Sequence, residues 1–329
     1  MPPAQPGPPP IALTSLSIRN FRGIDSLALD FRGPDGLPNN LVVLAGPNGS
    51  GKTAVLEAAL IAAGGAKLAT GHRGGRAVRR GAEGYEVRAD FRFRSRTLDD
   101  DITVIEKADT SAALPDPPVP HWYFSSWRAS TLVGAVNVTV GKRGRRPAKT
   151  DLNRLLNVKQ QLANAAAAQS FPGANRPLLR DYSLWIARIN QGWKKFYPGH
   201  DDEFVVGLAD SDEESNGAFE VFYIRENHPS LPVDELSAGQ LELFLFLAAL
   251  VLNDHREGIV FIDEPELHLD PQWHALIVRS LMALQPEAQF IVATHSPEIY
   301  DAAMSYERHF LVPEDDPRAR IWGQTPVRA

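Results

Sequence analysis

Alternation of apolar and polar residues predicts antiparallel strands in the first third of the chain. Residues 11–31 (IALTSLSIRNFRGIDSLALDF) alternate on both sides of a turn at 20–23, which is the pattern of a strand pair. Residues 85–96 alternate strictly and, with residues 101–108, predict an antiparallel hairpin. Four apolar residues of its first strand are expected to share the core-facing side: Val87, Ala89, Phe91 and Phe93.

Apolar runs next to helical segments indicate an α/β arrangement elsewhere. The run at 41–45 precedes AVLEAALIAAGG, a helix expected to end at its two glycines. From residue 236 a helix, the strand GIVFIDEPE, a helix over about 271–284 and the strand QFIVATHSP follow one another. This order is typical of parallel strands joined by helices, so we expect a parallel or mixed core sheet.

Between these parts the pattern becomes helical. Residues 151–169 and 176–197 are predicted helices, and strands are expected at 121–128, 203–208 and 218–224. Because no heptad repeat is sustained, the two helices indicate a short hairpin rather than a long coiled coil.

The segment GPNGSGKT has the spacing of a phosphate-binding P-loop and lies between a predicted strand and a predicted helix. Lys52 is expected to bridge the β- and γ-phosphates of ATP, and the Thr53 hydroxyl to bind Mg²⁺. A chance glycine-rich turn is the alternative, which the order of strand, loop and helix disfavours. The residues predicted to bind nucleotide here are Gly46, Pro47, Asn48, Gly49, Ser50, Gly51, Lys52 and Thr53.

The strand in IVFIDEPE (259–266) ends in two adjacent carboxylates. Asp263 is predicted to hold Mg²⁺ through water, and Glu264 to polarise the water that attacks ATP. Acidic residues that merely end a strand are the alternative, which the P-loop in the same chain disfavours. We therefore expect ATP and Mg²⁺ as cofactors.

The segment LSAGQ (236–240) resembles the signature element of ABC-type ATPases, through Ser237, Ala238, Gly239 and Gln240. In that family the element binds the γ-phosphate of the nucleotide held by the partner subunit. The resemblance therefore implies a homodimer that encloses two ATP molecules. Alone, the tetrapeptide is also a plausible helix N-cap, but Gly239 precedes Asp263 by 24 residues, which favours the signature.

Two further segments resemble elements of the same family. Leu269-Asp270-Pro271 is similar to the D-loop, with Asp270 as its carboxylate. His295 follows a predicted strand, 32 residues after Asp263, and resembles the switch histidine that contacts the γ-phosphate. The predicted catalytic set is thus Lys52, Asp263, Glu264 and His295.

The order of the motifs narrows the family. Lys52 and Ser237 are 185 residues apart, with a β-lobe and a helical insertion between them. This order resembles the heads of SMC-like and RecF-like DNA-associated ATPases, and in particular the ATP-binding heads of the OLD family, often labelled AAA family ATPases. The opening L-x-I-x-N-F-R-G-I, DEPELHLDPQWH and THSPEI carry the resemblance, over about residues 11–130 and 200–312. It also implies nucleotide contacts from Arg22 and from Arg79 or Arg80.

The chain departs from this family in two respects. It ends 34 residues after His295, which leaves no room for the TOPRIM nuclease domain of OLD nucleases, so we expect a separately encoded nuclease or toxin as effector. A glutamine loop is not evident, and Ser125 or Ser126 is expected in its place. The missing glutamine loop and the large insertion disfavour the motor of a membrane transporter.

The net charge of the chain is compatible with a nucleic-acid site only if basic residues cluster locally. The formal charge of −6 excludes a globally basic binder, but residues 71–96 hold eight arginines against three acids. DNA is therefore a candidate partner, and a solvated charged face is the alternative. The residues named for DNA contact are Arg73, Arg76, Lys142, Arg143, Arg145 and Arg146.

The absence of cysteine excludes disulfides and thiolate chemistry. No apolar run reaches the roughly 18 residues that span a bilayer, and the N-terminus lacks the pattern of a signal peptide. We therefore expect a cytoplasmic protein without a membrane partner.

Together these patterns predict an α/β P-loop NTPase, an ABC-type ATPase head with an antiparallel β-lobe and a short helical insertion. The expected function is ATP hydrolysis by a dimer that gates anti-phage defence or DNA repair through a separate effector; a nucleotide-dependent sensor with little turnover is the alternative. The expected segments are a disordered proline-rich tail (1–10), the N-terminal part of the head (11–130), a loop and helical-hairpin insertion (131–200), the C-terminal part of the head (201–315) and a tail (316–329).

Overall fold

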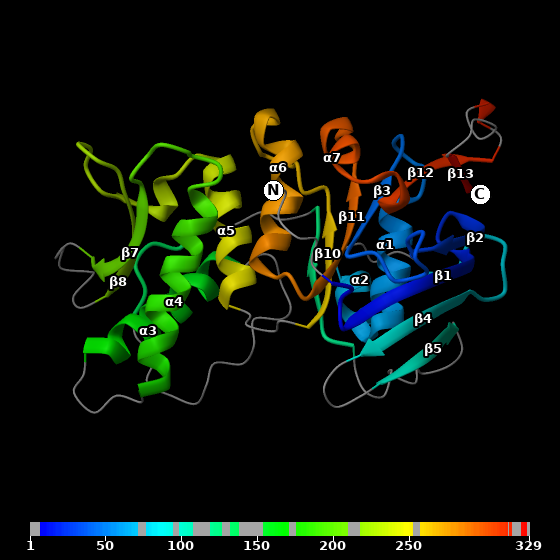
Figure 1. Cartoon of the computed structure of the whole chain (residues 1–329), viewed down its shortest axis with the longest axis horizontal. Coiled ribbons are helices and arrows are strands. Elements are labelled where there is room, and N and C mark those ends of the chain that lie inside the picture. Colours follow the sequence, from blue (N-terminus) through cyan, green and yellow to red (C-terminus); the bar gives the residue numbers. More distant parts are fainter. Residues whose placement is uncertain are drawn as a thin grey trace. The chain divides into compact units, whose positions relative to one another are not determined.

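In the computed structural model the chain forms two compact units, and each combines segments that are distant in the sequence (Figure 1). The first unit contains residues 1–127, 255–267 and 285–329, and the second contains residues 128–254 and 268–284. The division into five consecutive segments stays a prediction. The structure describes residues 7–71, 77–94, 99–107, 119–126, 132–137, 154–170, 176–209, 218–252, 257–314, 316–317 and 324–327.

A six-stranded sheet organises the first unit. In spatial order its strands are β13 (Gln324–Val327), β12 (Arg308–Pro313), β3 (Leu41–Ala45), β11 (Ala288–Thr294), β10 (Gly258–Asp263) and β6 (His121–Phe124). All neighbouring strands are parallel, which confirms the predicted core sheet. The central strands β3, β10 and β11 are buried throughout, as their continuous apolar sequences require. Strands β12 and β13, which extend the sheet beyond β3, were not predicted.

A four-stranded antiparallel sheet forms the β-lobe of the same unit. In spatial order its strands are β2 (Ile24–Asp30), β1 (Ile11–Phe21), β4 (Glu86–Arg94) and β5 (Asp99–Lys107). The antiparallel registers of β1 with β2 and of β4 with β5 confirm the predicted strand pair and hairpin. The predicted core-facing residues of β4 are only 0–2% exposed.

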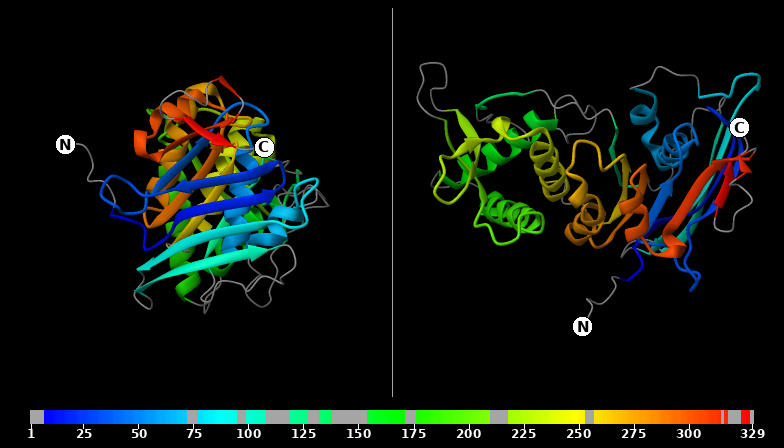
Figure 2. Two further views of the ribbon diagram at one scale, coloured as in Figure 1. Left: turned by 90° about the vertical axis from the view of Figure 1, so that its right-hand side faces the viewer. Right: turned by 90° about the horizontal axis from the view of Figure 1, so that it is seen from above.

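Helix α1 (Lys52–Leu60) lies between the two sheets and packs on strands of both (Figure 2). The expectation that this helix ends at two glycines was wrong. The chain continues through a π-helical segment, η1 (Ile61–Gly65), into α2 (Ala66–Gly71). Gly64 adopts φ 95°, which glycine reaches at little cost, so the helix kinks there instead of ending. Two short elements, α7 (Pro297–Ala302) and η4 (Ser305–Glu307), follow β11.

The second unit combines helices with a small antiparallel sheet. Its elements are α3 (Arg154–Ser170), α4 (Arg176–Trp193), β7 (Glu203–Leu208), β8 (Phe219–Ile224), β9 (Leu231–Pro232), η3 (Val233–Glu235), α5 (Ala238–Leu252) and α6 (Pro271–Leu284). The predicted helical hairpin and strands are confirmed, although α4 ends at Trp193 instead of near residue 197. Helix α5 packs on α3, α4 and α6 and is buried from Leu241 onward, which fits its apolar sequence. Across the described residues, no helix is long and apolar enough to cross a membrane.

A buried ion network ties α3 to the segment before α5. The Nζ of Lys159 donates to Glu220 Oε2 (2.8 Å), to the backbone oxygen of Gly134 (2.6 Å) and to the Asp234 carboxylate. Burial raises the pKa of Glu220. Burial acts in the same direction on Asp234, but hydrogen bonds from Lys159 and from the N–H of Val133 outweigh it and hold the pKa of Asp234 below its usual range.

Candidate nucleotide-binding site

Four loops converge at the carboxyl end of the parallel sheet, where ligands of α/β sheets commonly bind. The loops follow β3, β6, β10 and β11. They contribute the P-loop, Ser126, the Asp263-Glu264 pair and His295. Hydrogen bonds of 3.0–3.2 Å link the first three loops through Asp263, and a contact of 3.1 Å links Glu264 to His295. The structure thus brings the predicted catalytic residues to one edge of the sheet.

The P-loop backbone requires glycine at Gly46 and favours it at Gly49. Gly46 has φ 148°, and a Cβ there would lie 2.2 Å from the backbone oxygen of Leu311 in β12. Gly49 has φ 82° with open space around it, so its backbone conformation alone favours glycine. After Gly51, α1 begins without a side-chain hydrogen bond at its N-cap. Such a helix N-terminus is suited to a phosphate.

Lys52 lies inside the curve of the P-loop. It is 5% exposed, and its Nζ donates to the backbone oxygens of Gly46 (2.9 Å) and Pro47 (3.0 Å). Burial lowers the pKa of Lys52, and the carboxylates of Glu264, Asp263 and Glu266, at the end of β10 and just after it, oppose this shift. A buried cation held by neutral backbone oxygens is well placed to bind the phosphates of a nucleotide.

Asp263 gathers two hydroxyl groups. It is 1% exposed and accepts hydrogen bonds from Thr53 Oγ1 (3.2 Å) and Ser126 Oγ (3.0 Å). Ser126, one of the two serines that the sequence left open, therefore reaches this carboxylate, and its neighbour in the chain, Ser125, is buried. These side chains offer only oxygen donors, and Mg²⁺ takes one or two protein oxygens when phosphates and water complete its shell. The residues thus fit Mg²⁺.

Glu264 and His295 form the other half of the site. Glu264 Oε1 lies 3.1 Å from His295 Nε2, and the two side chains are 29% and 37% exposed. Glu264 has φ 53°, a left-handed conformation that is uncommon outside glycine, and its N–H donates to the Ala293 oxygen at 2.7 Å. Strained backbone of this kind persists where the surroundings fix it, often at functional sites. In this conformation Asp263 contacts Thr53 and Ser126, while the next residue, Glu264, contacts His295 in the loop after β11.

The sequence analysis missed Glu266. Its Oε1 accepts hydrogen bonds from Thr294 Oγ1 (2.9 Å) and from the His295 N–H (2.6 Å). The signal was visible as a third carboxylate in IDEPE, but only the geometry shows that it contacts the loop of His295.

Of the arginines expected near the nucleotide, Arg22 and Arg79 lie close to acidic residues in the structure. Arg22 forms an ion pair with Glu57 of α1 at 2.7 Å and donates to the Ala69 oxygen at 3.4 Å. Arg79 lies 4.0 Å from Asp25, and Arg80 is exposed. The roles of Arg22 and Arg80 in nucleotide binding stay predictions.

In the second unit the predicted signature residues begin α5. Ser237 Oγ accepts from the Gln240 N–H (3.3 Å), and Gln240 Oε1 accepts from the Ser237 N–H (3.2 Å), which is a capping box. The cap does not explain Gly239, where a Cβ would lie 2.6 Å from the backbone oxygen of His268. Glycine therefore permits a close approach between the predicted signature and the segment before Asp270. Ser237 and Ala238 are exposed.

The predicted D-loop carboxylate caps the next helix. Asp270 Oδ1 accepts from the Gln272 N–H at 3.0 Å, at the start of α6. Signature and D-loop residues are thus both placed by helix N-termini, and their contact with nucleotide stays a prediction.

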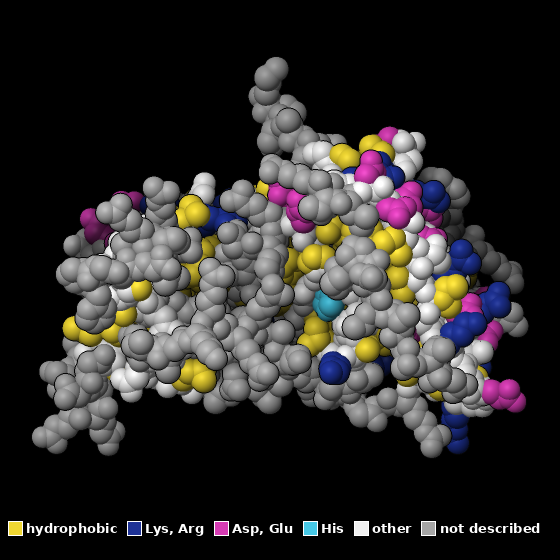
Figure 3. All heavy atoms as spheres, turned by 90° about the horizontal axis from the view of Figure 1, so that it is seen from below, with side chains coloured by type: hydrophobic (Ala, Val, Ile, Leu, Met, Phe, Trp, Pro, Cys, Tyr) yellow, Lys and Arg dark blue, Asp and Glu magenta, His cyan; other side chains and the backbone are white. Residues whose placement is uncertain are grey.

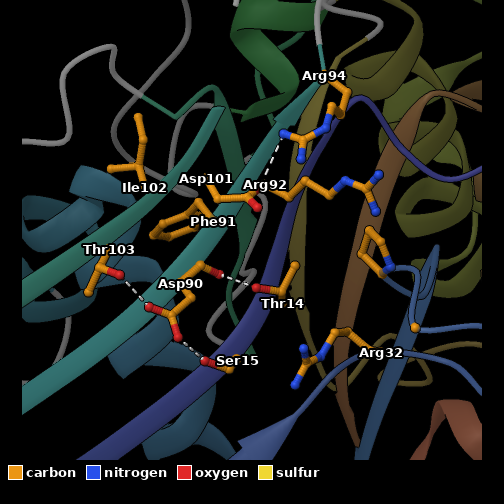
Figure 4. A pocket seen from close by; sticks show the side chains of 12 residues that line it. Thr14, Ser15, Arg32, Asp90, Phe91, Arg92, Arg94, Asp101, Ile102 and Thr103 are labelled. Atoms are coloured by element: carbon orange, nitrogen blue, oxygen red, sulfur yellow. Dashed lines mark hydrogen bonds and ion pairs between the residues drawn. The ribbon is translucent and has the colours of Figure 1, made fainter. Parts of the chain in front are cut away.

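The residues named for DNA contact lie outside the described residues: Arg73, Arg76, Lys142, Arg143, Arg145 and Arg146. On the side of the molecule that holds the β-lobe, basic and acidic side chains are interspersed (Figure 3). A polar pocket on this lobe is lined by Arg32, Arg92 and Arg94 (Figure 4). Arg32 pairs with Asp30 and Arg94 with Asp99, so neighbouring acids offset much of the basic charge. DNA binding stays a prediction.

The parallel sheet with its P-loop and the antiparallel β-lobe form a P-loop ATPase fold like that of SMC heads. The family model described as "AAA domain, putative AbiEii toxin, Type IV TA system" matches residues 41–301, and the chain belongs to this family. The match does not test the narrower resemblance to the OLD family.

Curated relatives match over shorter stretches. The Septu protein PtuA of Bacillus thuringiensis is 42% identical over 60 residues, which cover 18% of this chain and 15% of that protein. The Retron Vc95 probable ATPase of Vibrio cholerae serotype O1 biovar El Tor is 32% identical over 111 residues, which cover 30% of this chain and 21% of that protein. The chain thus matches about a fifth or less of the length of these relatives.

Solved structures match over most of the chain. An Smc head bound to the C-winged helix domain of ScpA is 14% identical, with a TM-score of 0.61, and the match covers 88% of this chain and 92% of that one. An Smc head with an extended coiled coil, bound to the C-terminal domain of ScpA derived from Pyrococcus furiosus, is also 14% identical, with a TM-score of 0.57 over 89% and 92% of the two chains. At this identity the likeness concerns the fold alone, and it confirms the predicted fold class.

Proposed function

We propose that this protein binds and hydrolyses ATP as a dimeric head that controls a separate effector. The observation that carries the proposal is the convergence of the P-loop, Asp263, Glu264 and His295 at the carboxyl end of one parallel sheet. Contacts of 3.1–3.3 Å join Thr53 to Asp263 and Glu264 to His295.

In the proposed reaction the P-loop and the N-terminus of α1 bind the phosphates of ATP, and the Lys52 ammonium turns from backbone oxygens to phosphate oxygens. Thr53 and Asp263 would hold Mg²⁺, which supplies positive charge to the phosphates when bound. Glu264 orients a water molecule and takes its proton as the water oxygen bonds to the γ-phosphorus. The bond from the γ-phosphorus to the bridging oxygen breaks, and ADP and phosphate leave.

The signature supports a dimer. Ser237 and Ala238 are exposed at the N-terminus of a 15-residue helix, where the partial positive charge of the helix favours an anion. In the proposed dimer this end of α5 binds the γ-phosphate held by the partner subunit, so each subunit completes the site of the other. Binding ATP would therefore favour association.

The proposed effector is a separate protein that acts in anti-phage defence. The names of the relatives, a Septu protein and a retron ATPase, and the toxin in the family description support a role in anti-phage defence with a separately encoded nuclease or toxin. Within this proposal the head is of the OLD type, DNA is a candidate trigger, and the protein works in the cytoplasm.

Steady-state ATP hydrolysis, measured with and without duplex DNA, tests the proposal. Hydrolysis by the wild type that Glu264→Gln loses, while both proteins bind ATP, would support it. ATP binding without turnover in either condition would favour the nucleotide-dependent sensor. A wild type that binds no ATP would overturn both functions.

A further inference from the structure

We propose that Glu266 is a positioning residue that sets the switch histidine for ATP hydrolysis, an inference that rests on the proposed function. Glu266 lies in the turn after β10, and its Oε1 accepts three hydrogen bonds from the last residue of β11 and the two residues that follow it. The donors are Thr294 Oγ1 (2.9 Å), the His295 N–H (2.6 Å) and the Ser296 N–H (3.2 Å). One oxygen thus binds the backbone on both sides of the histidine.

The turn around His295 is fixed on either side of this acceptor. Thr294 is 0% exposed, and its Oγ1 accepts from the Ser296 N–H at 2.9 Å. Ser296 in turn caps α7, because its Oγ accepts from the Ile299 N–H at 3.2 Å. His295 therefore sits between a buried threonine and a helix cap, and this backbone holds Nε2 at 3.1 Å from Glu264 Oε1.

A structural role alone explains Glu266 poorly. Strands β10 and β11 already pair in register from Gly258 to Asp263, so they do not need this side chain to associate. The Oε2 of Glu266 is buried and has no hydrogen-bond partner among the described residues. Burying an unpaired carboxylate oxygen costs free energy. The three hydrogen bonds that Oε1 accepts must offset this cost. Hydrogen bonds to a charged acceptor are roughly twice as strong as neutral ones.

If Glu266 acts by positioning His295, its effect on kcat depends on the His295 side chain. Glu266→Ala should let the turn move, which misplaces the imidazole without removing any predicted phosphate or Mg²⁺ ligand. We expect kcat to fall about 10- to 100-fold, as for an ångström-scale misplacement, with little change in the KM for ATP. Glu266→Gln keeps an acceptor at the position of Oε1 and should retain most of kcat. Glu287→Ala removes an exposed carboxylate before β11 and serves as the matched control.

Two measurements test the inference. Amide hydrogen exchange of the nucleotide-free protein should show faster exchange at His295 and Ser296 in Glu266→Ala, and wild-type protection in Glu266→Gln and Glu287→Ala. In a His295→Ala background, Glu266→Ala should add less than a twofold loss of kcat. If Glu266→Ala does not fold, Glu266→Asp provides the same comparison, because its shorter side chain withdraws the acceptor.

Unchanged exchange at residues 295 and 296, or an equal loss of kcat with and without the His295 side chain, would overturn the inference. The exchange measurement needs no turnover. A wild type without ATPase activity would therefore count against the proposed function, while the exchange rates would still decide whether Glu266 holds the turn.

Discussion

Glu264 and His295 follow neighbouring strands of the parallel sheet, and their side chains meet at 3.1 Å between Oε1 and Nε2. Where the Glu264 carboxylate is the acceptor, Nε2 carries the proton, and the imidazole is then a donor at the open edge of the site. A γ-phosphate oxygen is a stronger acceptor that could draw this donor away from Glu264. Binding of ATP would then free the Glu264 carboxylate to act on water.

His295→Ala should therefore impair hydrolysis more than binding. Removing one donor to the transferred phosphate typically lowers kcat by about 10²- to 10³-fold. The dissociation constant for ATP should change only a few-fold, because Lys52 and Thr53 remain. Single-turnover kinetics and isothermal titration separate the two quantities. Equal losses in affinity and in kcat/KM would assign His295 to ground-state binding instead.

Lys52→Ala should abolish ATP binding, because the P-loop loses its side-chain cation. Isothermal titration with ATP and Mg²⁺ measures this, and an unchanged affinity would contradict the P-loop assignment. The pH dependence is a second observable. Burial lowers the pKa of Lys52, so the ammonium of the free protein is lost at a lower pH than that of an exposed lysine. The affinity for ATP should therefore weaken earlier as the pH rises than exposed lysines would imply.

The sequence predicted most of the site because its residues fall into short motifs at strand ends. Gly46–Thr53, Asp263 and His295 each follow an apolar strand, and parallel strands bring such ends to one edge. Glu266 was missed because its role depends on the contact between two loops rather than on spacing. The contact between Ser126 and Asp263 also needed coordinates, since the spacing of residues does not show that these two side chains meet.

The errors in the fold have local causes. Two glycines predicted the end of a helix, but Gly64 takes a left-handed conformation inside a kink and the chain continues to Gly71. Strand β13 has only four residues, and neither β12 nor β13 has the alternation that revealed β4. They are defined by parallel pairing with each other and with β3, which a local pattern does not record.

Lys159→Met should destabilise the protein strongly. The Nζ of Lys159 is the shared partner of Glu220 and Asp234, and the lysine side chain is 0% exposed. Removing one partner from a buried ionic network typically costs about 3–5 kcal/mol, since it leaves buried charge uncompensated. The control is Lys194→Met, because Lys194 is 53% exposed and its substitution should cost under about 0.5 kcal/mol. Urea unfolding compares them, and similar midpoints would refute the prediction.

His309→Phe should make the protein less sensitive to acid. Burial lowers the pKa of His309 to about 4, and its ring meets Phe31 edge-on at 5.4 Å. An unfolded histidine titrates near pH 6.5, so the unfolded state binds more protons between pH 6.5 and about 4, and stability falls as the pH falls through this window. Protonation of His309 should therefore cost the wild type about 1–3 kcal/mol of unfolding free energy across this window, a range that allows for partial exposure of the side chain. Equal losses of stability between about pH 7 and pH 5 in wild type and variant would contradict this.

Glu264→Gln should accumulate as an ATP-dependent dimer. The substitution keeps the shape of the side chain and removes the charge that polarises water, so hydrolysis should fall about 10²- to 10⁴-fold. Asp263, Thr53 and Lys52 still bind ATP, which then remains in the site. Size-exclusion chromatography with light scattering, with and without ATP, measures the mass. The same mass in both conditions would argue against a nucleotide-enclosing dimer.

Substitutions at Ser237 test whether the signature holds that dimer together. Added to Glu264→Gln, Ser237→Arg should abolish the ATP-dependent mass increase, because it puts bulk where the γ-phosphate docks. The same variant also removes the hydroxyl that caps α5, so Ser237→Asp is the sharper comparison. Aspartate is a good N-cap, and its negative charge repels phosphate, so it should break the dimer while leaving the melting temperature near that of the parent. If the ATP-dependent dimer still forms with either substitution, the LSAGQ segment acts only as a helix cap.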